Sequence, residues 1–167
     1  MGQMCCSRSE PEPVIESLTH KADSMQEVLD NIYMGSAVAA KNLDLLKSNG
    51  ITHIIAIGWN LEKYFEDQFS YLLINKVEDG PECNILNYFQ SAHDFMDECL
   101  NKNPSGKMFV HCHKGLSRSA TIVIGYEMKR RRSNYQAVLS KIRQSRSFIM
   151  PNIGFQGLVH SAFAPRR

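Results

Sequence analysis

Residues 107–128 restrict the fold of this chain more than any other stretch. They read KMFVHCHKGLSRSATIVIGYEM, which is an apolar run, a short loop rich in hydrogen-bond donors and a second apolar run. This order is typical of a buried strand that enters a helix through a tight turn. We expect Cys112 at the end of the strand and Arg118 at the start of the helix, with residues 113–117 between them. A functional site is therefore expected in this turn.

The turn has the residue types that bind a tetrahedral oxyanion. Five residues between Cys112 and Arg118 are enough for successive N–H groups to point inward, with the helix N-terminus behind them. Gly115 can adopt the positive φ that such a curl requires, and the guanidinium of Arg118 can bind two phosphate oxygens. The positive potential of the helix N-terminus and of Arg118 also favours the thiolate form of Cys112, which is a nucleophile for phosphoryl transfer. A buried structural cysteine followed by an unrelated arginine is the alternative, and the joint pattern favours catalysis.

Composition excludes several other classes of protein. A chain of 167 residues suits one domain, and its formal net charge of +2 is too small to indicate nucleic-acid binding. The five cysteines form neither a CxxC pair nor a zinc-ligand pattern, so we expect no metal, no cofactor and a reducing, cytoplasmic location. A nuclear or membrane-associated location is the alternative. No apolar run approaches the roughly 18 residues that span a bilayer, and the N-terminus lacks the apolar centre of a secretory signal.

Strands and helices alternate along the chain. We expect two short strands joined by a turn over residues 25–35, a helix over 37–48 and strands over 51–58 and 71–77. EDGPEC predicts a loop over 78–83, and a strong apolar period predicts a helix over 84–102. Another helix is predicted over 135–142, and residues 147–155 lead into a last short helix. This alternation, without an internal repeat, predicts an α/β domain with a mainly parallel central sheet flanked by helices.

The two ends of the chain differ from its middle. Residues 1–24 are polar, contain proline and show no period, which predicts a flexible arm before a folded domain over 25–163 and a short tail over 164–167. Gly2 follows the initiator methionine, and Cys5 and Cys6 could take a second acyl chain, but Cys6 stands where the myristoylation pattern requires Ser or Thr. A plain arm and an acylated one therefore both stay open, and mass spectrometry of the native N-terminus decides between them.

The turn also resembles a known family. HCHKGLSRSA, at residues 111–120, is similar to the H-C-x-x-G-x-S-R-S signature of the dual-specificity protein phosphatases within the cysteine-based tyrosine phosphatase superfamily. The similarity extends from about residue 27 to about residue 163, and it includes IYMGS, NGITHII, DGPECNILNYF and PNIGF in the family's order. This resemblance implies the cysteine-phosphatase fold and a small member that consists of the catalytic domain alone.

The resemblance implies a role for each residue of the turn. Cys112 would attack phosphorus, and Ser119 would help the sulfur to leave in the second step. The phosphoryl oxygens would bind Arg118 and the loop amides, which include those of His113, Lys114, Gly115, Leu116 and Ser117. His111 would brace the loop and support the thiolate, and Asn152, in the P-N position, would steady the loop from behind. The implied reaction hydrolyses phosphotyrosine, phosphoserine and phosphothreonine in proteins through a phosphocysteine intermediate.

A leaving serine, threonine or tyrosine oxygen needs a proton, and such general acid catalysis is typically worth roughly 10²- to 10⁴-fold. Glu78, Asp79 and Glu82 all lie in the predicted loop over 78–83. Taken alone, Asp79 before a glycine would more often be a turn residue. The family places its acid ten residues before the aromatic of a helix-starting Y-F pair, and Asp79 lies ten before Phe89. The resemblance therefore implies that Asp79 is the general acid.

Two positions depart from the family's pattern. Lys114 adds a cation beside the phosphate, and Glu127 replaces a usual apolar residue in the central helix. Because phosphoinositide and RNA phosphatases of the superfamily favour more basic loops, a non-protein phosphate ester stays an alternative substrate. A non-turnover phosphopeptide-binding module on the same fold is the other alternative.

Some features have less specific interpretations. The basic run at residues 129–133 is typical of a solvated helix end, and a docking patch for an acidic partner is the alternative. Cys83, in the acid loop, is a candidate resolving partner for an oxidised Cys112. We expect a monomer whose partner is a phosphoprotein, which could be a protein kinase. Membrane contact is expected only through an acylated N-terminus.

Overall fold

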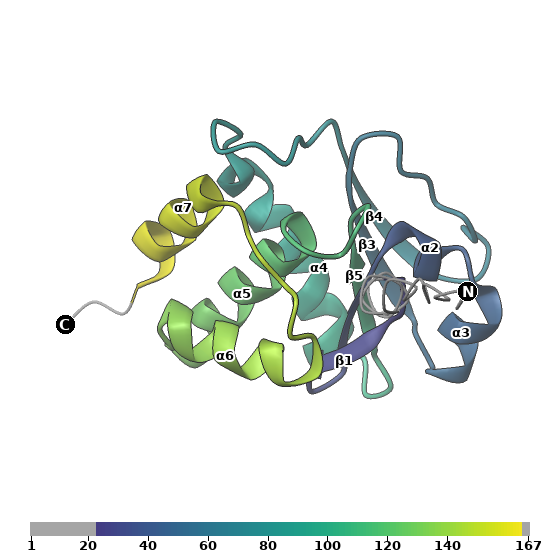
Figure 1. Ribbon diagram of the computed structural model, residues 1–167. Helices are drawn as coiled ribbons and strands as arrows, with labels where there is room; N and C mark the ends of the chain where they lie inside the picture. The colour runs from purple at the N-terminus through teal and green to yellow at the C-terminus, as the bar shows by residue number, and fades with distance from the viewer. Residues whose placement is uncertain (1–22, 165–167) are drawn as a thin grey trace, which may run out of the picture.

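The strands form one mainly parallel sheet. The computed structural model describes residues 23–164. Within this range the strands are β1 (Gln26–Leu29), β2 (Ile32–Gly35), β3 (His53–Gly58), β4 (Ser70–Asn75) and β5 (Met108–His111). They lie in the order β1-β2-β5-β3-β4, and β1 pairs antiparallel with β2 while the other neighbours are parallel. The strand that leads into the predicted functional turn, β5, therefore lies in the middle of the sheet (Figure 1).

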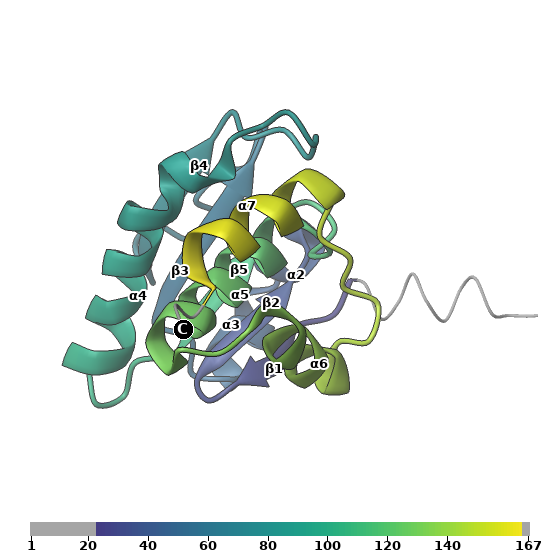
Figure 2. The ribbon, with the colours of Figure 1, turned by 90° about the vertical axis from the view of Figure 1, so that its left-hand side faces the viewer.

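Helices cover both faces of this sheet. They are α2 (Ala37–Ala40), α3 (Leu43–Ser48), the 3-10 helix η1 (Ile85–Tyr88), α4 (Phe89–Lys102), α5 (Arg118–Arg131), α6 (Tyr135–Ser145) and α7 (Ile153–Phe163). Figures 1 and 2 show α4, α5, α6 and α7 on one side of the sheet and α3 on the other. The prediction of an α/β fold with a mainly parallel sheet flanked by helices is confirmed.

Alternate side chains of the central strands belong to two separate cores. In β5, Met108 and Val110 pack into the larger core, whereas Phe109 packs into a smaller one with Ile54 and Leu46. All five side chains have no exposed surface. Full burial of such a side chain is worth about 1.5–3 kcal/mol, so both faces of the sheet hold β5 in place. This two-sided burial is why the sequence of the strands is almost continuously apolar.

The helix predicted over 37–48 is wrong as a single element. The chain leaves the helical path at Lys41 and Asn42, which separate α2 from α3. Asn42 has an extended backbone, and its Oδ1 accepts a hydrogen bond from the Leu45 N–H at 2.9 Å. This capping interaction starts a new helix. Asn84 similarly caps η1, so the helix predicted from residue 84 becomes α-helical only at Phe89.

The predicted arm and tail lie largely outside the described residues, as do Gly2, Cys5 and Cys6. The boundaries of the folded domain and the acylation therefore stay predictions. Among the helices described within residues 23–164, none is long and apolar enough to cross a membrane. His53, predicted to be a core residue, is 8% exposed and its Nδ1 lies 2.8 Å from the Thr52 hydroxyl.

Candidate active site

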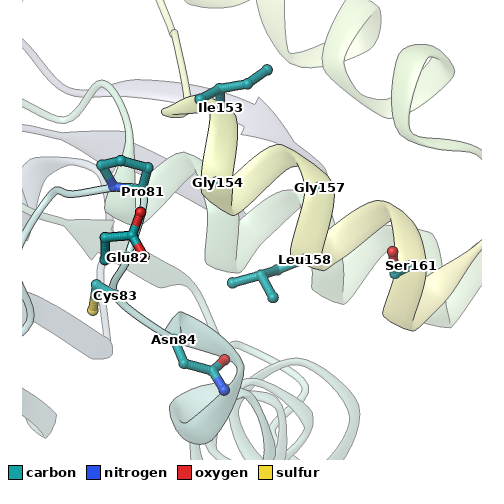
Figure 3. Close-up of a pocket in the computed structure, with 9 residues that line it drawn as sticks. All are labelled: Pro81, Glu82, Cys83, Asn84, Ile153, Gly154, Gly157, Leu158 and Ser161. Carbon is teal, nitrogen blue, oxygen red and sulfur yellow. The ribbon is translucent and has the colours of Figure 1, made fainter.

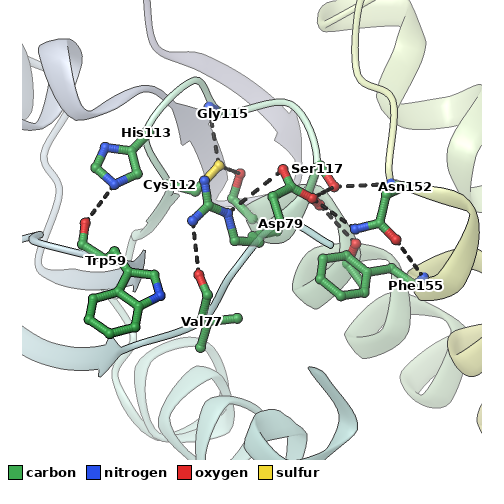
Figure 4. A network of polar contacts seen from close by, with 12 residues as sticks. Trp59, Val77, Asp79, Cys112, His113, Gly115, Ser117, Asn152 and Phe155 are labelled. Carbon is green, nitrogen blue, oxygen red and sulfur yellow. Dashed lines mark hydrogen bonds and ion pairs between the residues drawn. The ribbon is translucent and has the colours of Figure 1, made fainter. Parts of the chain in front are cut away.

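The loop over residues 112–118 joins the central strand β5 to the buried helix α5. Cys112 follows β5 directly and is 1% exposed, and Arg118 is the first residue of α5. The Gly115 N–H donates to Cys112 Sγ at 3.2 Å, and the Ser119 hydroxyl lies 3.4 Å from the same sulfur (Figure 4). Donors around a sulfur atom stabilise negative charge on it. The Gly115 N–H is therefore placed to stabilise negative charge that develops on this sulfur.

The carbonyl groups of residues 113–117 are all hydrogen-bonded to the structure around the loop. The donors, in chain order, are Ala37 N–H at 3.0 Å, Arg146 Nη2 at 3.3 Å, Arg146 Nε at 3.0 Å, Met150 N–H at 3.0 Å, and the Thr121 N–H and hydroxyl at 2.8 Å. With the carbonyl groups held on the outside of the curl, the N–H groups are left to line its inside. The loop is therefore a ready-made anion cradle.

Arg146 is a part of this site that the sequence did not reveal. Its side chain has no exposed surface, and it binds the outside of the loop at Lys114 and Gly115. The remaining guanidinium nitrogen, Nη1, donates to the Ser24 carbonyl at 3.1 Å and to Gln26 Oε1. Burial lowers the pKa of Arg146 to about 10, so it stays charged at neutral pH. An arginine just after the end of a helix, as Arg146 is after α6, is usually exposed, which is why no local signal indicated this role.

Gly115 has the positive φ that the sequence predicted. Its φ is +66°, and a Cβ there would lie 2.3 Å from the Gly35 carbonyl oxygen in β2. Both the backbone conformation and the close approach of a neighbouring strand require glycine.

A cavity of about 240 Å³ opens above the loop. It is lined by Asp79, Cys112, His113, Lys114, Leu116, Ser117 and Arg118. Arg118 is 9% exposed, and its Nη1 donates to the Val77 carbonyl at 3.0 Å. Its Nε has no hydrogen-bond partner among the described residues and lies 3.8 Å from Asp79 Oδ2. This buried N–H, which makes no hydrogen bond within the described residues and belongs to a residue that lines the cavity, is available to an oxyanion.

The structure brings Asp79 to this cavity, whereas Glu78 and Glu82 line a different pocket. Asp79 Oδ1 accepts hydrogen bonds from the Ser117 hydroxyl at 2.6 Å and from Asn152 Nδ2 at 2.8 Å (Figure 4). Asn152 therefore contacts the side chain of Asp79 as well as the loop, which its backbone N–H reaches at Ser117 Oγ.

The two histidines on either side of Cys112 lie in different surroundings. His111 is fully buried and stacks on Phe109, with the ring centroids 5.3 Å apart. Burial lowers the pKa of His111 to about 4, so its ring is neutral at neutral pH. Its support of the thiolate stays a prediction. His113 is exposed, and its Nε2 donates to the Trp59 carbonyl at 2.5 Å on the rim of the site.

Cys83 lines a different pocket from Cys112. This pocket, of about 490 Å³, lies between the loop after Asp79 and α7 (Figure 3). Its lining is formed by Pro81, Glu82, Cys83, Asn84, Ile153, Gly154, Gly157, Leu158 and Ser161. Among the described residues, Cys83, Cys99 and Cys112 are free thiols. A redox role of Cys83 stays a prediction.

Glu127, the unusual acidic residue of α5, is 3% exposed and neutralises part of the basic run that follows it. Its carboxylate lies 2.8 Å from Arg130, 3.6 Å from Arg131 and 4.0 Å from Lys141. These contacts agree with a structural role for part of the run, and docking of an acidic partner stays the alternative. Within residues 23–164, no group of three or more His, Cys, Asp or Glu side chains is placed to hold a metal ion.

A thiol that accepts a backbone N–H, lies beside a hydroxyl group and shares its cavity with a guanidinium group can bind and attack a phosphoryl group, as in the class of cysteine-dependent phosphatases. Comparison with known proteins leads to the same class. A family model described as "Dual specificity phosphatase, catalytic domain" matches residues 32–162. The chain belongs to this family.

Individual relatives agree with this assignment. Dual specificity protein phosphatase 1 of Homo sapiens is 40% identical over 131 residues, which are 78% of this chain and 35% of that protein. MAP kinase phosphatase with leucine-rich repeats protein 1 of Dictyostelium discoideum is 38% identical over 128 residues, 77% of this chain and 15% of that protein. The crystal structure of human tyrosine phosphatase-like serine/threonine/tyrosine-interacting protein has a TM-score of 0.77 at 33% identity, over 82% of this chain and 93% of that chain.

The chain spans about a third of the length of the human phosphatase that it matches. The likeness to the crystal structure confirms the prediction of the cysteine-phosphatase fold.

Proposed function

We propose that this chain hydrolyses phosphotyrosine, phosphoserine and phosphothreonine in proteins through a phosphocysteine intermediate. The observation that carries the proposal is the meeting of three groups at one cavity. These are the Cys112 thiol with the Gly115 N–H that donates to it, the Arg118 Nε that makes no hydrogen bond within the described residues, and the carboxyl group of Asp79. Family membership supports the same reaction.

In the first step the phosphoryl group binds Arg118 and the N–H groups of the 112–118 loop. The Cys112 thiolate attacks phosphorus, so an S–P bond forms while the ester O–P bond breaks and its electron pair goes to the leaving oxygen. The carboxyl group of Asp79 gives its proton to that oxygen. The cradle is worth most in this step because its donors are already aimed at the site where charge develops.

In the second step a water molecule attacks the phosphocysteine. Asp79, now ionised, takes a proton from the water while the O–P bond forms. The S–P bond breaks and its electron pair returns to Cys112 Sγ. The Ser119 hydroxyl, 3.4 Å from this sulfur, can donate to the departing thiolate. Phosphate then leaves and the starting state is restored.

The substrate is proposed to be a phosphoprotein, and a protein kinase is one candidate because a relative is named a MAP kinase phosphatase. We propose that the enzyme acts as a cytoplasmic monomer. Lys114 lines the cavity and keeps phosphoinositides as the second candidate substrate. A non-turnover binding module is the third candidate, and the intact Cys112 and Asp79 favour turnover over it.

Hydrolysis of 4-nitrophenyl phosphate directly tests the proposal that this chain is a phosphatase. Wild type should turn over, Cys112→Ser should not, and Arg118→Lys should lose activity because a lysine lacks the planar fork. Cys83→Ser is the matched control, since Cys83 lines a different pocket, and it should keep the wild-type rate. A wild-type rate no better than that of Cys112→Ser would end the proposal. Comparison of kcat/KM on phosphopeptides and on phosphoinositides then separates the two substrate classes.

A further inference from the structure

One oxygen of Asp79 is held by two side chains that come from different parts of the fold. Oδ1 accepts a hydrogen bond from Ser117, in the 112–118 loop, and another from Asn152, at the start of α7 (Figure 4). The other oxygen, Oδ2, faces Arg118 Nε at 3.8 Å. The Asp79 side chain is 34% exposed, so Oδ2 can reach an ester bound in the cavity. The two oxygens are therefore in unequal surroundings.

The orientation of the Asn152 amide leaves no ambiguity about its donor. Its Oδ1 accepts a hydrogen bond from the Phe155 N–H at 3.0 Å, which caps α7, so Nδ2 must face Asp79. Serine, threonine or aspartate would cap a helix as well as asparagine does. Of these, asparagine is the one whose side chain both accepts from the helix and donates through an amide N–H to a carboxylate. The residue type at position 152 is therefore explained by Asp79 rather than by the helix.

The hydroxyl group of Ser117 is also committed to Asp79. Serine is a favoured N-cap residue, and Ser117 stands at the N-cap of α5, yet its side chain makes no capping hydrogen bond there. Its Oγ accepts instead from the Asn152 N–H at 3.0 Å and donates to Asp79 at 2.6 Å. Because the oxygen already accepts one bond, its proton is directed to the carboxylate. Ser117 is 5% exposed, so water competes little for it.

These contacts decide which oxygen carries the proton that the leaving group needs. A proton on Oδ1 would point at two donors, and a protonated oxygen donates rather than accepts. When Asp79 is protonated, the geometry therefore favours the proton on Oδ2, which faces the cavity and makes only a long contact of 3.8 Å with Arg118 Nε. The same bonds hold the loop that carries Asp79 against the 112–118 loop before any substrate is present.

We propose that Ser117 and Asn152 are positioning residues for the general acid, which hold Asp79 by Oδ1 and direct the proton on Oδ2 to the leaving oxygen. This inference rests on the proposed function. It extends that function by assigning to Asn152 a task in acid catalysis, where the family resemblance implied only support of the loop.

The test measures kcat/KM for aryl phosphates whose leaving phenols range from strong to weak acids. A good leaving group such as 4-nitrophenolate needs little acid catalysis, whereas phenolate needs much. Asn152→Ser keeps a helix cap but removes the donor to Asp79, and Ser117→Ala removes the other donor. Each should lose about 10-fold on phenyl phosphate, part of the roughly 10²- to 10⁴-fold that an acid contributes, and far less on 4-nitrophenyl phosphate. Asp79→Ala should show the steepest dependence on the leaving group.

Asn134→Ser is the matched control, because Asn134 caps α6 through the Ala137 N–H in the same way and does not line the cavity. It should keep the wild-type dependence on the leaving group, and Ser117→Thr should restore part of the lost acid catalysis. If Asn152→Ser and Ser117→Ala lost the same factor on every ester, or lost nothing, the inference would be overturned. If wild type released no phosphate from any ester, the proposed function would fail and this inference would fall with it.

Discussion

A buried histidine in α4, outside the lining of the Cys112 cavity, makes the stability of this protein depend on pH. His93, in α4, is 2% exposed and packs against Phe89, Tyr126 and Phe163 with ring centroids 5.0, 5.5 and 5.6 Å away. Its Nε2 has no hydrogen-bond partner among the described residues. Burial lowers the pKa of His93 from 6.5 to about 4.

This shift has a definite sign and size. Between pH 6.5 and about 4 the unfolded chain binds a proton at His93 that the folded chain does not bind, so acid favours unfolding. At about 1.4 kcal/mol for each pH unit between the two pKa values, the full loss is about 3 kcal/mol. The contribution of neutral His93 to the free energy of unfolding is fully present above pH 6.5 and is lost as the pH falls to about 4. Fully buried His111, whose pKa is also about 4, adds a loss of similar size. Typical domains have only about 5–15 kcal/mol of stability in total.

His93→Phe tests the assignment, because phenylalanine keeps the aromatic packing and removes the titrating group. Urea unfolding, followed by far-ultraviolet circular dichroism, gives the free energy of unfolding at several pH values from 7.5 to 4.5. Over this range wild type should lose about 2–3 kcal/mol more than the variant. His160→Phe, on the exposed side of α7, is the matched control and should lose as much as wild type. Equal losses in wild type and His93→Phe would refute the reasoning.

Two further substitutions probe the support of the site. Gly154→Ala should impair acid catalysis, because its Cβ would lie 2.2 Å from the Pro81 carbonyl oxygen and push the loop that carries Asp79 away from α7. The value of kcat/KM should fall more for phenyl phosphate than for 4-nitrophenyl phosphate. An equal fall for both esters would contradict this prediction. Arg146→Lys should cost about 1–3 kcal/mol and slow turnover, because it leaves the buried Gly115 carbonyl without the Nε donor. Urea unfolding and 4-nitrophenyl phosphate assays check the prediction for Arg146→Lys. A variant with the stability and the turnover rate of wild type would exclude it.

Elements that depend on residues close together in the chain could be predicted from the local sequence. The strand, turn and helix over residues 107–128 could be predicted because apolar runs, a glycine and a donor-rich loop each act within a few residues of their position. The helix over 37–48 was predicted wrongly for a related reason. Residues with high helix propensity are frequent throughout this stretch, so the pattern predicted one helix. The break depends on a single hydrogen bond between the Asn42 side chain and the Leu45 N–H, which the composition of the stretch does not reveal.

The sequence alone predicted Cys112 as the nucleophile and the following loop as an anion cradle, and the family resemblance implied Asp79 as the acid. Only the tertiary structure decided what holds them. Arg146 reaches the outside of the cradle from 31 residues beyond Gly115, and Asn152 reaches Asp79 from 73 residues away. Such contacts depend on how α6 and α7 pack against the sheet, and the residue types involved are ordinary helix-end residues when seen alone. The residue types of the 112–118 loop can therefore be recognised from the local sequence. Their positions in space depend on contacts with distant parts of the fold.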